Sequence, residues 1–121
     1  MSMSVEQFLS LSDAEQLQTI KDLNDIGQEE IIIDVLTGVG IDNLSVPLLG
    51  ELGRAYNNND KPEEAIKVFK TIDTEHRDAV WHYRCAYSHG SIASTNHEAY
   101  TSENMQQMLA LVDNGVRLAT K

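Results

Sequence analysis

The chain has 121 residues, enough for one domain with a single core, and 41% of them are hydrophobic. The 19 acidic residues exceed the 9 basic residues, and the net charge of −10 disfavours binding to nucleic acids and to anionic membrane surfaces. The longest apolar run covers residues 108–112, and a β-branched run is formed by Ile31-Ile32-Ile33; both are far too short for a membrane span, and we expect no signal peptide. Cys85 is the only cysteine, which excludes a disulfide framework, so we expect a cytoplasmic protein.

Capping signals mark the first helices. Ser4 with Gln7 forms a weak capping box, and Ser12 with Glu15 forms a better one. Apolar residues then recur at the three- and four-residue spacing of an amphipathic helix. The N-terminal third of the chain therefore predicts helices over residues 5–11, 13–25 and 28–37.

The remaining helices follow turn residues and further caps. Ser45 caps a helix over 46–57, and Asp60 is the expected N-cap of the next helix, which includes Ile72. A third helix covers 78–89, because the small polar residues from Gly90 onward predict a loop, and a last helix begins at Ser102. Strand signals are almost absent. We therefore predict an all-α protein of about seven helices, in which short turns make neighbouring helices antiparallel hairpins.

One hairpin carries a repeat motif. Large and small residues occur at matched positions on its two helices: Leu49, Leu52, Gly53, Tyr56, Ala65 and Phe69. In this spacing they resemble a tetratricopeptide repeat, in which the small residues let the two helices approach closely. The resemblance implies a short right-handed superhelix over one domain, 1–121. Its best repeat covers about 46–77, and degenerate units cover about 13–37 and 78–121.

Two short segments carry a closer resemblance. The segments "RAYNN" (54–58) and "WHYR" (81–84) are similar to those of small bacterial tetratricopeptide-repeat proteins. That group implies no activity, and a few of its members are linked to toxin–immunity systems. The resemblance covers about residues 13–89 and weakens after Gly90.

The repeat motif also implies a binding groove. Repeats of this kind line a concave groove with the first helix of each hairpin. The groove-facing residues would be Glu51, Arg54, Asn57, Asn58, Tyr83, Arg84 and Tyr87. We therefore predict a protein-interaction module that binds a peptide or protein, with a basic partner favoured by the net charge. The alternatives are structural: Arg84 pairs with Glu51 across adjacent helices, and the asparagines only form the turn.

Other functions have weaker support in the sequence. On a helix, His82, Cys85 and His89 share a face and offer zinc ligands or a nucleophilic thiol, with His97 or Glu98 completing a metal site. These positions coincide with packing positions of the repeat, and no cofactor motif is present, so we expect neither an enzyme nor a bound cofactor. Trp81, Met105 and Met108 form either core or an exposed surface. The apolar last helix either caps the fold or forms a homodimer interface.

Overall fold

The computed structural model describes residues 2–95 and 102–119, with side chains described for 2–93 and 106–119. All regular structure in these residues is helical, which confirms the all-α class and the predicted number of helices. None of the described helices is both long enough and apolar enough to cross a membrane. The α-helices are α1 (Val5–Leu9), α2 (Asp13–Asp25), α3 (Glu29–Val39), α4 (Val46–Asn58), α5 (Pro62–Lys70), α6 (Ala79–Thr95) and α7 (Ser102–Ala119), with 3-10 turns η1 (Ile41–Asn43) and η2 (Thr74–His76).

Serine side chains cap three helices at the predicted positions. The Ser4 hydroxyl accepts a hydrogen bond from the backbone N–H of Gln7 at 3.0 Å, and the Gln7 side chain accepts one from the N–H of Ser4 at 2.9 Å. Ser12 and Glu15 form the same reciprocal pair, and the Ser45 side chain caps α4. Each cap stabilises its helix by about 1 kcal/mol, which explains why local sequence places these three helix starts correctly.

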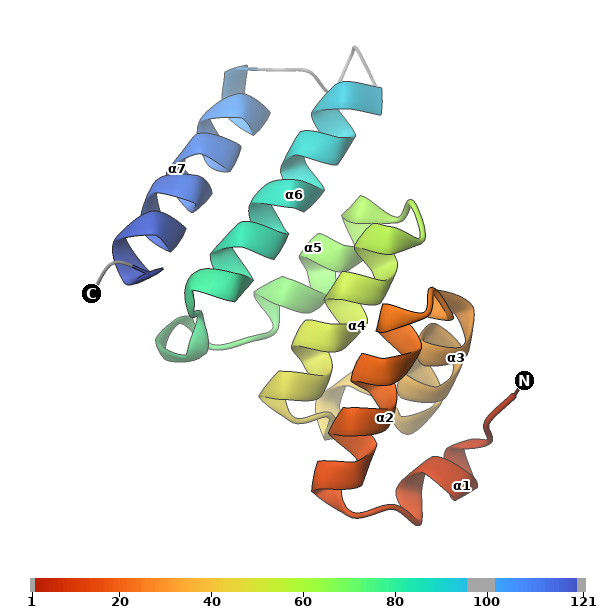
Figure 1. Ribbon diagram of the computed structural model, residues 1–121. Helices are drawn as coiled ribbons and strands as arrows, with labels where there is room; N and C mark the ends of the chain where they lie inside the picture. The colour runs from red at the N-terminus through yellow and green to blue at the C-terminus, as the bar shows by residue number, and fades with distance from the viewer. Residues whose placement is uncertain (1, 96–101, 120–121) are drawn as a thin grey trace.

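The helices pack as three consecutive hairpins, α2–α3, α4–α5 and α6–α7, with α1 against α3 (Figure 1). Each later hairpin places its first helix against both helices of the hairpin before it, so α4 contacts α2 and α3, and α6 contacts α4 and α5. The described part of α7 packs mainly against α6, at the opposite end of the stack from α1 (Figure 1). The predicted hairpins are present, and the right-handed superhelix stays a prediction.

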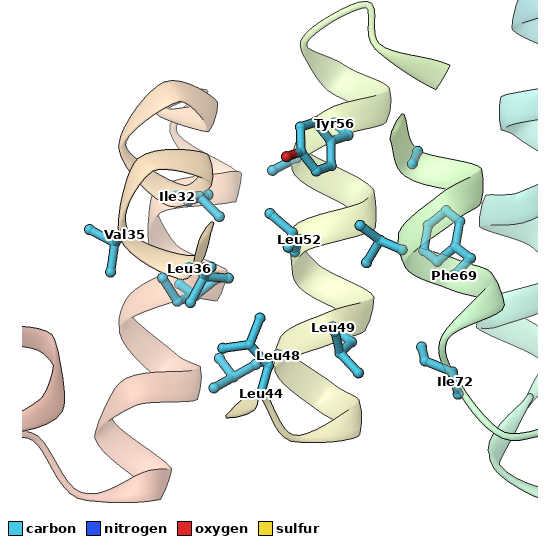
Figure 2. Packing of buried hydrophobic residues seen from close by; sticks show 14 of the residues in the cluster. Ile32, Val35, Leu36, Leu44, Leu48, Leu49, Leu52, Tyr56, Phe69 and Ile72 are labelled. Atoms are coloured by element: carbon cyan, nitrogen blue, oxygen red, sulfur yellow. The ribbon is translucent and has the colours of Figure 1, made fainter. Parts of the chain in front are cut away.

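The main core lies on both sides of α4. Figure 2 shows Leu36 of α3 facing Leu48 of α4 on one side, and Phe69 of α5 on the other. Leu52, in the middle of α4, is completely buried. Burial of each such side chain stabilises the fold by roughly 1.5–3 kcal/mol, and α4 contributes such residues to the core on both of its sides.

α4 and α5 lie close together at Gly53. A Cβ atom at this position would lie 2.2 Å from Cε1 of Phe69, a distance that no real side chain tolerates. Phe69 and Ala65, which the motif places on the facing helix, are both completely buried. The close approach that the sequence predicts between Gly53 and this helix is therefore confirmed.

Trp81 belongs to the core. Its indole Nε1 donates a hydrogen bond to the backbone oxygen of Phe69 at 2.9 Å, and its ring is 7% exposed. The guanidinium of Arg77 lies 4.5 Å from the centre of the same ring. Met108 is half-buried, and the side chain of Met105 lies outside the described residues. Of the three residues proposed for either core or surface, Trp81 is thus assigned to the core.

The predicted end of α6 is wrong. The helix does not stop at His89 but continues through Gly90 to Thr95. Glycine costs about 1 kcal/mol relative to alanine inside a helix, which is why the sequence predicts a break. Here α7 packs directly on the glycine. A Cβ atom added to Gly90 would lie only 3.0 Å from the sulfur of Met108. Contacts with α7 offset the low helix propensity.

The predicted cap of α5 is also wrong. The N-cap residue is Lys61, which forms no side-chain cap, and Asp60 lies in the left-handed region with φ of 57°. Aspartate tolerates this conformation better than most residues, so the turn between α4 and α5 uses Asp60 for its backbone angle. Pro62 then begins α5, where its missing N–H is not needed.

The negative charge is concentrated at one end of the stack. Residues 1–45, which form α1 to α3, contain nine acidic residues and one lysine, a net charge of −8. The remaining residues, 46–121, contain ten acidic and eight basic residues, a net charge of −2. The α6–α7 end is therefore nearly neutral, while the α1–α3 end is strongly acidic.

Candidate interaction site

Six of the seven residues predicted to face a groove surround one surface hollow. This hollow has a volume of about 230 Å³ and lies between α4 and α6; we call it the α4–α6 hollow. The two helices bring together residues that are about 30 positions apart in the chain. Its lining residues are Arg54, Asn57, Asn58, Tyr83, Arg84 and Tyr87.

Two tyrosines stand at the edge of the α4–α6 hollow. Tyr83 is 70% exposed and Tyr87 is 53% exposed, on the same side of α6 because they are four residues apart. Neither ring belongs to the main core. Large aromatic side chains at such exposure offer rigid contact area to a partner.

Glu51, the seventh predicted residue, lies beneath this surface. Its side chain is 5% exposed and bridges three helices. One carboxylate oxygen accepts a hydrogen bond from the amide of Asn24 on α2 at 3.3 Å, and the other accepts from the guanidinium of Arg84 on α6 at 3.2 Å. Glu51 is therefore a buried connecting residue, and the alternative interpretation of Arg84 as its ion-pair partner is confirmed.

Both arginines of the hollow have internal partners. Arg84 also donates to the backbone oxygen of Gly50 at 3.1 Å, so its guanidinium is held across α4. Arg54 donates to Glu51 at 3.3 Å and to Asp25 at the end of α2 at 3.1 Å. Since these carboxylates already neutralise the guanidinium groups, the arginines are poorly placed to grip a carboxylate of a partner.

The asparagines have two different roles. Asn57 is 7% exposed and lies inside α4, where its amide donates to the backbone oxygen of Arg84 at 3.0 Å and accepts from the hydroxyl of Ser88 at 2.7 Å. Asn58 is exposed at the last position of α4. Of the two predicted residues, only Asn58 presents its side chain to solvent beside the tyrosines. Asn57 fixes α4 against α6.

Three participating residues were absent from the sequence prediction. Asn24, Asp25 and Ser88 connect α2, α4 and α6 through the bonds described above. Asn24 and Ser88 are polar residues at positions where their helices are otherwise apolar, and both are buried. A polar residue within an apolar stripe is the signal that could have identified them.

The residues proposed for zinc or thiol chemistry face different neighbours. Cys85 is 2% exposed in the main core, and burial raises the pKa of its thiol to about 11. His82 lies against α7, where its Cβ would be 3.2 Å from a Cβ on Gly115. Burial lowers the pKa of His82, as does the nearby Arg77. A thiol with so high a pKa is protonated at neutral pH, so Cys85 lacks the thiolate that a nucleophile requires.

Among the side chains that the structure describes, Asp73, Glu75 and His76 are the only set of three that bring ligand atoms within 4.8 Å of one another. All three are exposed near η2, and exposed acidic groups of this kind are common without a metal ion. His82, Cys85 and His89 do not converge in this way. His97 and Glu98, proposed to complete their site, lie outside the described residues.

Searches against protein-family models, curated proteins and solved structures find no match to this chain. The resemblance to tetratricopeptide repeats therefore stays a prediction that rests on the motif residues themselves.

Proposed function

We propose that the chain is a non-catalytic interaction module that binds a peptide segment of another protein in the α4–α6 hollow. One observation carries the proposal: Tyr83 and Tyr87 stand exposed beside this hollow, with the exposed side chain of Asn58 also lining it. Tyrosines are enriched in protein-binding surfaces, because a rigid ring loses little conformational entropy on binding. The amide of Asn58 suits the backbone of an extended peptide.

The charges around the hollow favour a basic peptide. Asp25, at its edge, is 65% exposed, and the α1–α3 end beyond it carries a net charge of −8. Arg54 and Arg84 are neutralised by Asp25 and Glu51 and do not oppose a cationic ligand. The expected ligand therefore has apolar or aromatic groups for the tyrosines and a net positive charge, which the acidic α1–α3 end attracts.

Peptide binding is tested on an array of short peptides that differ in net charge, followed by titration of the tightest binders. Tyr87→Ala is expected to weaken binding about tenfold, because it removes one of the two exposed aromatic rings that the ligand contacts. Asp25→Asn is expected to weaken the binding of basic peptides by about twofold to fivefold, the usual magnitude for one exposed charge, because Arg54 loses its neutralising partner and repels a cationic ligand. Both residues are exposed, so the fold is retained.

Asp34→Asn is the matched control, since Asp34 is an exposed aspartate on α3 away from the hollow. It removes the same charge from the same acidic end and should leave affinity unchanged. Peptides that bind Tyr87→Ala as tightly as the wild type would contradict this location. An array on which no peptide binds would contradict the proposed function itself.

A further inference from the structure

A second exposed surface lies between α6 and α7. Six of the nine large apolar side chains that are exposed in the described part of the chain belong to these two helices, at exposures between 43% and 70%. They are Val80, Tyr83, Tyr87, Leu109, Val112 and Val116. Such a concentration on one face is unusual for a monomer and typical of an interaction surface.

This face is hollowed along its length. One cavity of about 410 Å³ lies between Ala86 and Gly90 of α6 and Met108 of α7, and a second of about 340 Å³ lies between Ala79 of α6 and Gly115 of α7. Tyr83 and Val112 line both cavities, so the two form one continuous apolar groove, which we call the α6–α7 groove.

The groove corresponds to the position where earlier hairpins receive a helix. On α4, Gly50 and Asn57 contact α6, through the bonds from Arg84 to the Gly50 oxygen and from Asn57 to the Arg84 oxygen. Tyr83 and Gly90, each 33 positions later in the sequence, are the corresponding residues of α6, and both line the α6–α7 groove. The groove is therefore shaped for packing against another helix.

We propose that a second copy of this chain covers the α6–α7 groove, forming a two-fold homodimer through α6 and α7. The face contains both parts that a two-fold interface needs. Val112 and Val116 form the α7 wall of the groove, and with the exposed Leu109 they make an apolar ridge along α7. In such a dimer the ridge of each copy packs into the groove of the other.

The charge distribution favours a second copy over a basic partner on this face. Residues 79–119 contain three acidic and two basic residues, a net charge of −1, so two of these faces repel each other little. The acidic α1–α3 ends, at −8 each, lie at the opposite end of the stack and stay far apart in the dimer (Figure 1). A basic partner would be drawn to those ends instead.

The chain exposes more surface than an average compact monomer. Its accessible surface is 7352 Å² at a mass of 13.5 kDa, whereas a compact monomer of this mass exposes about 6,500 Å². A larger surface than average is consistent with a chain that has a face left for a partner to cover.

Sedimentation equilibrium over a roughly hundredfold dilution series tests the proposal on the full chain. The wild type is expected at twice 13.5 kDa at the high end of the series. Val112→Glu is expected to weaken the dimer by about a hundredfold or more and to give the monomer mass, because it buries a charge in the interface. Leu109→Glu, on the same ridge and 55% exposed, should have the same effect.

Ile26→Glu is the matched control, because Ile26 is 63% exposed at the end of α2 and gains the same charge. It should leave the dimer intact. A wild type that stays monomeric at every concentration overturns the proposal, as does a dimer that survives both α7 variants or is lost in Ile26→Glu.

Tyr83 and Tyr87 line both the α4–α6 hollow and the α6–α7 groove. The two proposals are therefore separated by variants on α7, which does not line the hollow. Leu109→Glu tests the dimer without changing the hollow, and peptide binding is measured on this variant as well as on the wild type.

Discussion

The hairpins α4–α5 and α6–α7 differ in what surrounds them. α4–α5 has a neighbouring hairpin on each side, and its apolar residues, such as Leu52 and Phe69, are completely buried. α6–α7 has a neighbouring hairpin on one side only, and apolar residues such as Val112 remain exposed. The difference teaches that an apolar stripe is buried by its position in the stack, since the stripe itself does not specify its neighbour.

The largest expected effect tests this contrast directly. Phe69→Ala should lower the free energy of unfolding by roughly 3–5 kcal/mol, because it leaves a cavity between tightly packed helices. Leu109→Ala removes a side chain that is 55% exposed and should cost less than about 0.5 kcal/mol in dilute solution. Urea unfolding monitored by circular dichroism measures both. Similar losses in the two variants would contradict the assigned difference in burial.

An intermediate effect concerns two glycines on α4. Gly53→Ala should destabilise the protein by roughly 1–3 kcal/mol, because the new methyl group would overlap the buried ring of Phe69. Gly50→Ala places its methyl group 3.5 Å from the guanidinium of Arg84, an ordinary contact, and should stabilise the helix by up to about 1 kcal/mol. Thermal unfolding of the pair should therefore show shifts of opposite sign. A stabilised Gly53→Ala would refute the close crossing of α4 and α5.

The smallest expected effect is a pH dependence of stability that differs between the α4–α5 and α6–α7 hairpins. Burial against α7 lowers the pKa of His82 in the folded protein below its usual value of about 6.5. As the pH falls through about 6.5, the unfolded chain binds a proton before the folded chain does, so the folded state loses stability. Hydrogen exchange should show α6–α7 opening more at about pH 5.5 than at about pH 7.5.

His82→Gln is the control for this pH effect. It keeps a polar side chain at the same place but does not titrate, so exchange in α6–α7 should become less dependent on pH. The amides of α4 and α5 should respond less than those of α6 and α7 in the wild type. An unchanged pH dependence in His82→Gln would assign the effect to another group.

Local chemistry accounts for the parts of the fold that the sequence predicts. The caps at Ser4, Ser12 and Ser45 need only residues three positions away, and the pairing of Gly53 with Phe69 follows from the spacing of one short hairpin. Most residues of the α4–α6 hollow were predictable for a similar reason. They lie on the first helices of two adjacent hairpins, at positions that the spacing of the motif residues predicts.

Long-range packing decides the parts that were missed. The burial of Glu51 and the roles of Asn24 and Ser88 depend on partners 27 to 33 residues away, a separation at which helix periodicity carries no information. The continuation of α6 through Gly90 also depends on a long-range contact. Its low helix propensity predicts a loop, and only the contact with Met108 of α7 explains why α6 continues.

Glu51 has a further consequence for how the stack unfolds. Repeat stacks usually couple only adjacent units, so their end hairpins can detach independently. This single carboxylate is bonded to Asn24 on α2 and to Arg84 on α6, and so ties the first hairpin to the third through the second. Loss of either neighbour leaves a buried charge with fewer partners, which penalises every partly unfolded form. Detachment of either end hairpin should therefore cost more free energy than the loss of its apolar contacts alone.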